Sequence, residues 1–89
     1  MGFVVLLHPK AVKELNKLEP QIGSRIKERL RDLENNPEIV GKALKPSRFW
    51  RLRIGDYRVI YEVDKAEKRV VVLFIGHRKR VYDDFSSLL

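Results

Sequence analysis

The stretch that decides the fold is WRLRIGDYRVIY, residues 50–61. Apolar and polar residues alternate before Gly55 and Asp56, a pair that suits the two-residue turn of an antiparallel hairpin. Leu52 and Ile54 fall on one face of the first strand, and arginines fall on the other. The stretch therefore predicts a β-hairpin with one apolar face and one basic face.

Two further strands are expected around this hairpin. The run RVVVLFIG, residues 69–76, is apolar at consecutive positions, which is typical of a central strand buried on both faces. The run FVVLL, residues 3–7, is short and rich in β-favouring residues, and Pro9 stops it. In the second strand of the hairpin, four side chains share one face: Tyr57, Val59, Tyr61 and Val63.

Two amphipathic helices are predicted between the first strand and the hairpin. One begins at Pro9 and the other at Pro20, because proline suits the first turn of a helix. Apolar residues recur at helical spacing in both: Ala11, Val12, Leu15 and Leu18, then Ile22, Ile26, Leu30 and Leu33. Residues 37–44 are expected to make one short helical turn, and the C-terminal tail is expected to finish in a short helix.

The order β-α-α-β-β-β(-α) predicts an α+β fold, with a mostly antiparallel four-stranded sheet and two N-terminal helices packed on one face. The other face is expected to be partly open and lined with arginine. At 89 residues the chain is too short for two independent cores, so residues 1–89 are expected to form a single domain.

Composition narrows the classes of function. The formal net charge of +7 at pH 7 favours a polyanionic partner, without distinguishing RNA, DNA, an anionic membrane surface or an acidic protein. Cysteine is absent, which excludes disulfides, thiolate catalysis and zinc sites built on sulfur. No apolar run approaches the roughly 20 residues that span a bilayer, and the N-terminus lacks the basic region of a signal peptide. A cytoplasmic location is therefore expected.

Two basic clusters could perform chemistry. The first consists of Arg51, Arg53 and Arg58 in the hairpin, because guanidinium groups bind phosphate bidentately and keep their charge near neutral pH. The second is GHRKRVY, residues 76–82, where the end of a rigid strand can hold functional side chains. Each has a simpler interpretation. Arginine stems can cover apolar surface while their heads stay in water, and the second cluster can be a solvated basic tail with a packed Tyr82.

Outside these clusters the sequence gives little support for a site. Asp83 and Asp84 are adjacent, so their side chains would diverge in a strand or in a helix, and no metal site is expected. Trp50 could stack on a base, but a place in the core or in a partner interface is the simpler interpretation. Neither a metal nor a cofactor is expected.

The sequence resembles the RelE toxins of the RelE/ParE superfamily, close to their archaeal branch. The resemblance rests on HPKAVKELNKL at 8–18, WRLRIGDYRVIYEV at 50–63 and IGHRKRVYDDF at 75–85, of which the last two motifs are specific. It implies a compact fold of the microbial-ribonuclease type, and a toxin that cuts mRNA in the ribosomal A site. The implied reaction is attack by the ribose 2′-hydroxyl on the adjacent phosphate without a metal, which leaves a 2′,3′-cyclic phosphate and a 5′-hydroxyl.

The resemblance also implies a role for individual residues. The implied catalytic residues are Arg53, Arg58, His77, Arg78 and Tyr82. In these roles, Arg53 and Arg58 stabilise charge on the phosphate, and Tyr82 orients or deprotonates the 2′-hydroxyl. Arg78 neutralises the leaving oxygen, and His77 donates a proton, as an imidazole can near neutral pH.

A second set is implied to bind RNA. It comprises Lys45, Arg48, Arg51, Arg53, Lys79 and Arg80. The sequence departs from the best-known members of the family by having arginine at positions 51 and 53 and histidine at position 77, where those members have lysine. The spacing from Arg78 to Tyr82 is also shorter.

Two alternatives remain open at this point. One is a ParE-like toxin that inhibits DNA gyrase by binding, and the other is a non-catalytic RNA-binding or ribosome-binding module. The partners that the resemblance implies are a RelB-like antitoxin, the ribosome and its mRNA, with operator DNA bound only through the antitoxin complex. An acidic, amphipathic antitoxin would complement the net charge. No membrane partner is expected.

Overall fold

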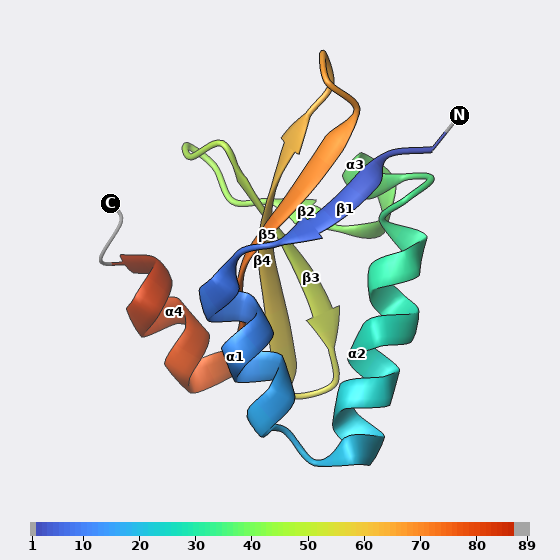
Figure 1. Cartoon of the computed structure of the whole chain (residues 1–89). Coiled ribbons are helices and arrows are strands. Elements are labelled where there is room, and N and C mark those ends of the chain that lie inside the picture. Colours follow the sequence, from blue (N-terminus) through green and yellow to red (C-terminus); the bar gives the residue numbers. More distant parts are fainter. Residues whose placement is uncertain (1, 87–89) are drawn as a thin grey trace.

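The computed structural model describes residues 2–86, in which a five-stranded sheet is combined with four helices (Figure 1). The elements are β1 (Val4–Leu7), α1 (Pro9–Lys17), α2 (Pro20–Asp32), α3 (Pro37–Val40), β2 (Lys42–Ala43), β3 (Phe49–Ile54), β4 (Tyr57–Asp64), β5 (Arg69–His77) and α4 (Arg78–Ser86). The predicted C-terminal helix is therefore present as α4. The rest of the predicted tail, residues 87–89, lies outside the described residues.

The strand order is β1-β5-β4-β3-β2, with β1 parallel to β5 and the other three pairs antiparallel. The mostly antiparallel sheet is confirmed, and β5 takes the interior position that its apolar sequence predicts. The predicted number of four strands was wrong, because Lys42 and Ala43 pair with Arg51 and Trp50 to form an additional edge strand. A strand of two residues is too short to carry a periodic signal.

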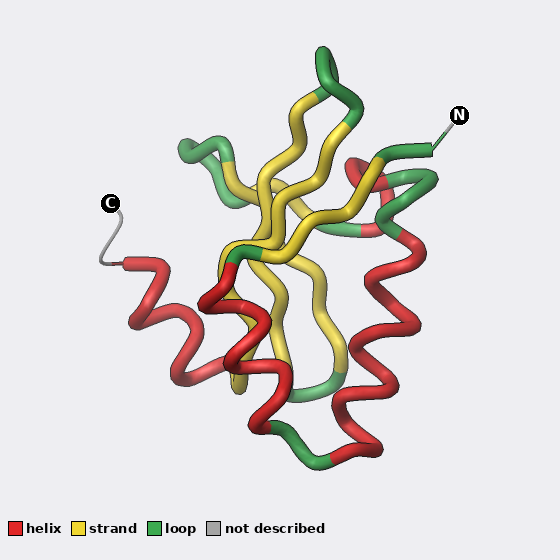
Figure 2. The backbone as a smooth tube through the Cα atoms, viewed as in Figure 1, coloured by secondary structure: helices red, strands yellow, loops and turns green. Residues whose placement is uncertain are grey.

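The β3–β4 turn and the β4–β5 turn lie at opposite ends of the sheet (Figure 2). Gly55 begins the β3–β4 turn with φ +58°, a left-handed conformation that glycine adopts without a steric penalty. Two-residue hairpins use such turns because their twist matches that of the strands. The predicted hairpin is therefore confirmed, and its turn has the required backbone.

Helices α1 and α2 cover one face of the sheet, as predicted. The core on this face contains these buried residues: Ala11, Leu15, Ile26, Leu30, Leu33, Leu52, Ile54, Val59, Tyr61, Val70, Val72 and Ile75. Tyr57 and Val63 pack against this core, so the four residues predicted to share a face of β4 do so. No helix within residues 2–86 has the length and hydropathy needed to cross a membrane.

The second face is partly open, as predicted, because α4 packs on only part of it. Val81 and Phe85 of α4 form a separate buried cluster with Phe49, Ile60 and Phe74 of the sheet. Figure 1 shows α4 and α2 at opposite sides of the view with strands between them. The rest of this face carries the arginines of the hairpin.

Candidate active site

The register of the β3–β4 hairpin gathers three arginines on one face of the sheet. Arg53 lies directly opposite Arg58, and Arg51 lies opposite Ile60. Opposed residues of antiparallel strands project to the same face, as do residues two apart along one strand. Arg51, Arg53 and Arg58 are called the arginine cluster below. Ile60 belongs to the buried cluster beneath α4, so the arginine cluster shares the face that carries α4.

Arg58 is the most enclosed member of the cluster, with 6% of its surface exposed. Its Nη1 donates to the carbonyl oxygens of Gly55 and Tyr57 at 2.7 and 2.8 Å, so the side chain braces its own turn. Its Nε is buried and has no hydrogen-bond partner among the described residues. A buried donor without an acceptor lowers stability. Arg58 therefore fixes the turn and brings a buried positive charge beneath the exposed Arg53.

Arg51 connects the sheet to α4. Its Nη1 donates to the hydroxyl oxygen of Tyr82 at 3.3 Å, although the two residues are 31 positions apart. Both side chains are partly buried, and the Nε of Arg51 also has no partner within the described part of the chain. The structure thus brings the hairpin cluster and the tyrosine of the second predicted cluster into direct contact.

Three exposed cations, Arg78, Lys79 and Arg80, form the first turn of α4. The N–H of Arg78 donates to the carbonyl oxygen of Asp56 at 2.8 Å, which ties the start of the helix to the hairpin turn. Arg78 and Tyr82 are four positions apart, so they lie on the same side of α4. This segment is therefore an ordered helical turn held at the hairpin turn.

His77 lies on the opposite face of the sheet from the arginine cluster. It is opposite Tyr57 in the β4–β5 register, and the two rings meet edge to face with centroids 5.7 Å apart. Its Nδ1 accepts from the N–H of Lys79 at 3.3 Å. The structure does not bring His77 together with Arg53 and Tyr82, because alternate positions of a strand face opposite ways. The predicted proton-donor role of His77 therefore has no geometric support.

The two basic residues between β2 and β3 have different surroundings. Arg48 pairs with Glu62, with 3.1 Å between Nε and Oε2, and its guanidinium lies 5.5 Å from the centroid of the Phe49 ring. Lys45 is exposed and takes part in none of the ion pairs of the described residues. Lys45 is thus free of an ion pair in this part of the chain, whereas Arg48 is exposed and would exchange Glu62 for a phosphate.

The positive charge of the arginine cluster and of the first turn of α4 is not compensated by an ion pair within the described residues. None of their ion pairs involves the arginine cluster or the first turn of α4. Arg53 and Arg58 even oppose each other, an arrangement of like charges that destabilises a hairpin. The described residues contain no group of three or more His, Cys, Asp or Glu side chains that could hold a metal ion. Guanidinium forks without counter-ions form a site that suits a phosphate group.

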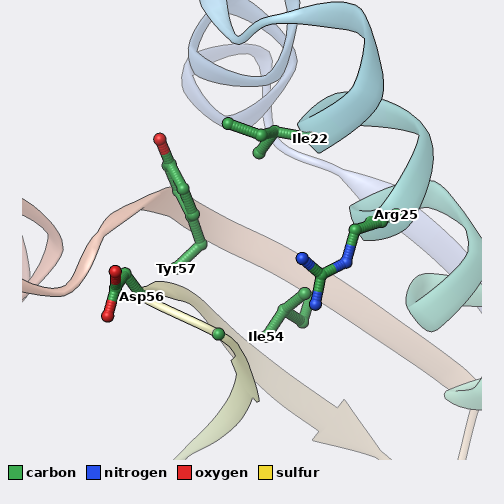
Figure 3. Close-up of a pocket in the computed structure, with 6 residues that line it drawn as sticks. Ile22, Arg25, Ile54, Asp56 and Tyr57 are labelled. Carbon is green, nitrogen blue, oxygen red and sulfur yellow. The ribbon is translucent and has the colours of Figure 1, made fainter.

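A cavity of about 230 Å³ lies on the other side of the hairpin, between α2 and the β3–β4 turn. Figure 3 shows Arg25 reaching from α2 toward Ile54, with Tyr57 and Ile22 on the neighbouring wall. The lining includes no member of the arginine cluster and excludes Tyr82. This cavity is therefore separate from the candidate active site.

Sequence reasoning missed a groove that adjoins the arginine cluster. The groove has a volume of about 600 Å³ and lies between residues 44–47 and the side chains of Tyr82, Phe85 and Ser86 on α4. The spacing of Tyr82 and Phe85 along the tail was the available signal, since residues three apart neighbour each other on a helix. The loop 44–47 has no sequence pattern that would have predicted its position opposite Tyr82 and Phe85.

Comparison with known proteins gives this fold and site a family. A family model described as the ParE toxin of the type II toxin–antitoxin system parDE matches residues 5–82. The chain is 33% identical to toxin RelG of Mycobacterium tuberculosis over 85 residues, which cover 92% of this chain and 98% of RelG. The chain therefore belongs to the RelE/ParE superfamily of toxins from type II toxin–antitoxin systems. Together with a 32% match to toxin RelE of the same organism, the match to RelG identifies it as a RelE-family toxin.

Solved structures agree with this assignment. The toxin–antitoxin complex RelBE2 from M. tuberculosis matches with a TM-score of 0.82 and 32% identity, over 88% of this chain and 100% of that chain. The archaeal RelE–RelB complex from Pyrococcus horikoshii OT3 matches with a TM-score of 0.72 and 31% identity, over 90% and 99% of the two chains. The resemblance drawn from the sequence motifs is confirmed.

Proposed function

We propose that this toxin is a ribosome-dependent endoribonuclease that cuts mRNA in the A site and thereby stops translation. The observation that carries the proposal is the contact of Arg51 with Tyr82 beside an arginine cluster that takes part in none of the ion pairs of the described structure. When the 2′-hydroxyl of RNA attacks the adjacent phosphate, one group must accept the proton of that hydroxyl, and other groups must donate hydrogen bonds to the phosphate. A phenolic oxygen held against arginines supplies both kinds of group.

The proposed reaction begins when the ribose 2′-oxygen attacks the adjacent phosphorus. Tyr82 acts in its phenolate form: it orients the 2′-hydroxyl and takes its proton to become the neutral phenol, and the bond from phosphorus to the 5′-oxygen breaks. The products are a 2′,3′-cyclic phosphate and a 5′-hydroxyl, whose proton comes from solvent or from a group of the ribosome. His77 is left out of this scheme because its ring faces the other side of the sheet. The scheme requires no metal ion.

The arginines have distinct parts in this proposal. Arg53 is exposed and binds the phosphate directly, and the buried Arg58 contributes the positive charge of its guanidinium from below. Preorganised donors of this kind are worth about 3 kcal/mol each in comparable oxyanion sites. Arg78 neutralises the leaving oxygen, while Arg51 holds Tyr82. Lys45, Arg48, Lys79 and Arg80 bind the RNA backbone on either side.

The proposed partners follow from the same charge. A RelB-like antitoxin is proposed to bind this toxin, because two of its solved relatives are toxin–antitoxin complexes. An acidic, amphipathic segment of the antitoxin would neutralise the arginine cluster and exclude substrate at once. The ribosome and its mRNA are the targets, which places the toxin in the cytoplasm. Operator DNA is bound only through the antitoxin complex, and no membrane is involved.

The decisive experiment adds the purified toxin to ribosomes translating a defined mRNA and maps new 5′ ends by primer extension. The expected result is cleavage within A-site codons that requires ribosomes and falls at least about tenfold, or 1.4 kcal/mol of barrier, in Tyr82→Phe and Arg53→Ala. Arg31→Ala is the matched control, because it removes an exposed arginine from α2. Intact mRNA in the presence of the folded toxin would refute the proposal.

One observation favours a second candidate function. The family model that matches residues 5–82 is described as a ParE toxin, and ParE-like toxins inhibit DNA gyrase by binding. That function would not need the phenolic oxygen of Tyr82. A gyrase supercoiling assay decides between the two, since inhibition that survives Tyr82→Phe without any mRNA cleavage would replace the ribonuclease proposal.

A further inference from the structure

The groove beside the arginine cluster has the dimensions of a ligand site. Its volume of about 600 Å³ falls within the range of about 300–1,000 Å³ that small-molecule sites occupy. One wall is the loop 44–47 between β2 and β3, and the other is the last half of α4 with Tyr82, Phe85 and Ser86. The two walls come from segments far apart in the sequence.

Both walls are held by the same residue of the sheet, Phe49. On the loop side, the N–H of Leu44 donates to the carbonyl oxygen of Phe49 at 2.9 Å, and the N–H of Phe49 donates to the hydroxyl of Ser47 at 3.2 Å. The loop is closed by a bond of 2.9 Å from the N–H of Ser47 to the carbonyl oxygen of Leu44. On the helix side, the ring of Phe85 packs edge to face on Phe49, with centroids 5.3 Å apart. The groove is therefore preformed.

The groove is continuous with the proposed reaction centre through Tyr82. This residue lines the groove, and its hydroxyl accepts the hydrogen bond from Arg51. An occupant of the groove would therefore lie next to the group that meets the 2′-hydroxyl. In a strand of RNA, the nearest neighbours of that hydroxyl are the bases on either side of the cleaved bond.

The chemistry of the lining suits a nucleobase with its phosphate. Leu44 and Pro46 provide apolar surface and Tyr82 a partly exposed ring, on which any base can stack, and the buried ring of Phe85 lies beneath them. Lys45 is exposed, and among the described residues of the lining it is the only charged one. A base that stacks between the walls would leave its phosphate within reach of an exposed cation and of the neighbouring arginines.

We propose that this groove binds the base of one nucleotide that flanks the cleaved phosphate, with Lys45 contacting the backbone beside it. The inference rests on the proposed function and adds a second point at which the substrate is held. Contacts to phosphates hold a nucleic acid strand but do not decide which phosphodiester bond lies at Tyr82. A stacked base does decide this, because it prevents the strand from sliding along its own axis. The groove thus sets which 2′-hydroxyl reaches Tyr82.

The test is a binding measurement that does not depend on cleavage. Fluorescently labelled RNA trinucleotides with methylated 2′-oxygens are titrated with the toxin, intact and with one abasic nucleotide at each position in turn. The phosphates are unchanged in this series, so only stacking is removed. The expected result is one position at which loss of the base weakens binding about fivefold or more, the lower end of base–aromatic stacking. Equal binding of the intact and abasic trinucleotides would overturn the inference.

Two variants locate the effect. Ser86→Trp places an indole at the exposed end of the groove and is expected to abolish the difference between intact and abasic RNA. Ser24→Trp makes the same exchange at an exposed position of α2 and is expected to preserve it. Two further results would overturn the inference. One is a base preference that survives Ser86→Trp, and the other is a Ser86→Trp variant that loses binding to an antitoxin while it still binds RNA. Base-dependent binding without mRNA cleavage on ribosomes would instead refute only the proposed reaction.

Discussion

The guanidinium of Arg51 and the hydroxyl of Tyr82 meet at 3.3 Å and join β3 to α4 across the face that carries the arginine cluster. Arg51 projects from the sheet, whose backbone is fixed by pairing on both sides. Tyr82 projects from a helix that is held by the burial of Val81 and Phe85. The position of the phenolic oxygen is therefore set by the packing of α4 and by one hydrogen bond.

Arg51→Ala and Tyr82→Phe are expected to be non-additive in mRNA cleavage. Each is expected to lower the rate at least about tenfold, because each removes one end of the same contact. The double variant is expected to resemble the more damaged single variant, as groups that act as a unit do. Single-turnover cleavage on programmed ribosomes measures all four proteins. If the fold-losses in cleavage rate of the two single variants multiply in the double variant, the two residues act independently.

Arg58→Met is expected to destabilise the fold by about 1–2 kcal/mol, because the carbonyls of Gly55 and Tyr57 lose a charged donor. Relief of the repulsion with Arg53 offsets only part of this loss. Arg53→Met is the matched control, and its effect is expected within about 0.5 kcal/mol because Arg53 is exposed. Urea denaturation measures both. Equal stabilities of the two variants would show that Arg58 does not brace the turn.

Gly41→Ala is expected to destabilise the protein by about 1–3 kcal/mol through overpacking. A Cβ at position 41 would lie 1.8 Å from the hydroxyl of Tyr61 and 2.9 Å from the carbonyl oxygen of Arg51. Gly23→Ala provides the contrast, since the nearest atom is the carbonyl oxygen of Leu15 at 3.9 Å. Because position 23 lies within α2, where alanine is favoured over glycine, Gly23→Ala is expected to stabilise the protein by about 0.5–1 kcal/mol. Thermal denaturation of the two variants checks the opposite signs.

Stability is expected to fall at alkaline pH because of Tyr61. Burial, and to a smaller extent the nearby Glu38 carboxylate, raises the pKa of Tyr61 well above its ordinary value of 10.0. The hydroxyl also donates to the carbonyl oxygen of Pro37, a bond that the phenolate cannot make. Since the folded pKa exceeds the unfolded one, this stabilisation is complete below pH 10 and declines as the pH rises, by at most about 1.4 kcal/mol per unit.

The comparison with Tyr61→Phe isolates this effect, because lysines and the other tyrosines titrate in both proteins. The free energy of unfolding is measured by urea denaturation between pH 8 and pH 11. The wild-type protein is expected to lose more stability over this range than the variant. Parallel curves would show that Tyr61 is not responsible.

The hairpin and the shared face of its arginines could be predicted from the sequence. Strict alternation of apolar and polar residues indicates a strand and also shows which side chains lie on the same face. The face of His77 could not be predicted, because β5 is apolar at consecutive positions and conceals which of its residues points which way. Its facing depends on the register with β4, which includes an irregularity between Ile60 and Tyr61. The burial of Arg58 was also hidden, since it depends on the carbonyls of a folded turn.

The helix α4 shows the same limit on a larger scale. Its apolar residues Val81 and Phe85 predict a helix, but their partners Phe49, Ile60 and Phe74 are spread over three strands. Sequence periodicity defines a helical face and leaves its partner undefined. The groove and the contact with Arg51 follow from that packing, so neither could be derived from the chain.

The pairing of β1 with β5 bears on how this toxin is synthesised. Residues Val4–Leu7 pair in parallel with Arg69–Val72. The first strand therefore cannot join the sheet until the fifth strand has been synthesised. Proteins dominated by such distant contacts fold late and slowly, whereas local units can fold as they leave the ribosome. The strand that closes the sheet immediately precedes the helix that carries Tyr82. A ribosome therefore translates the segment from β1 through β4 before the nascent chain can complete the sheet that supports Tyr82.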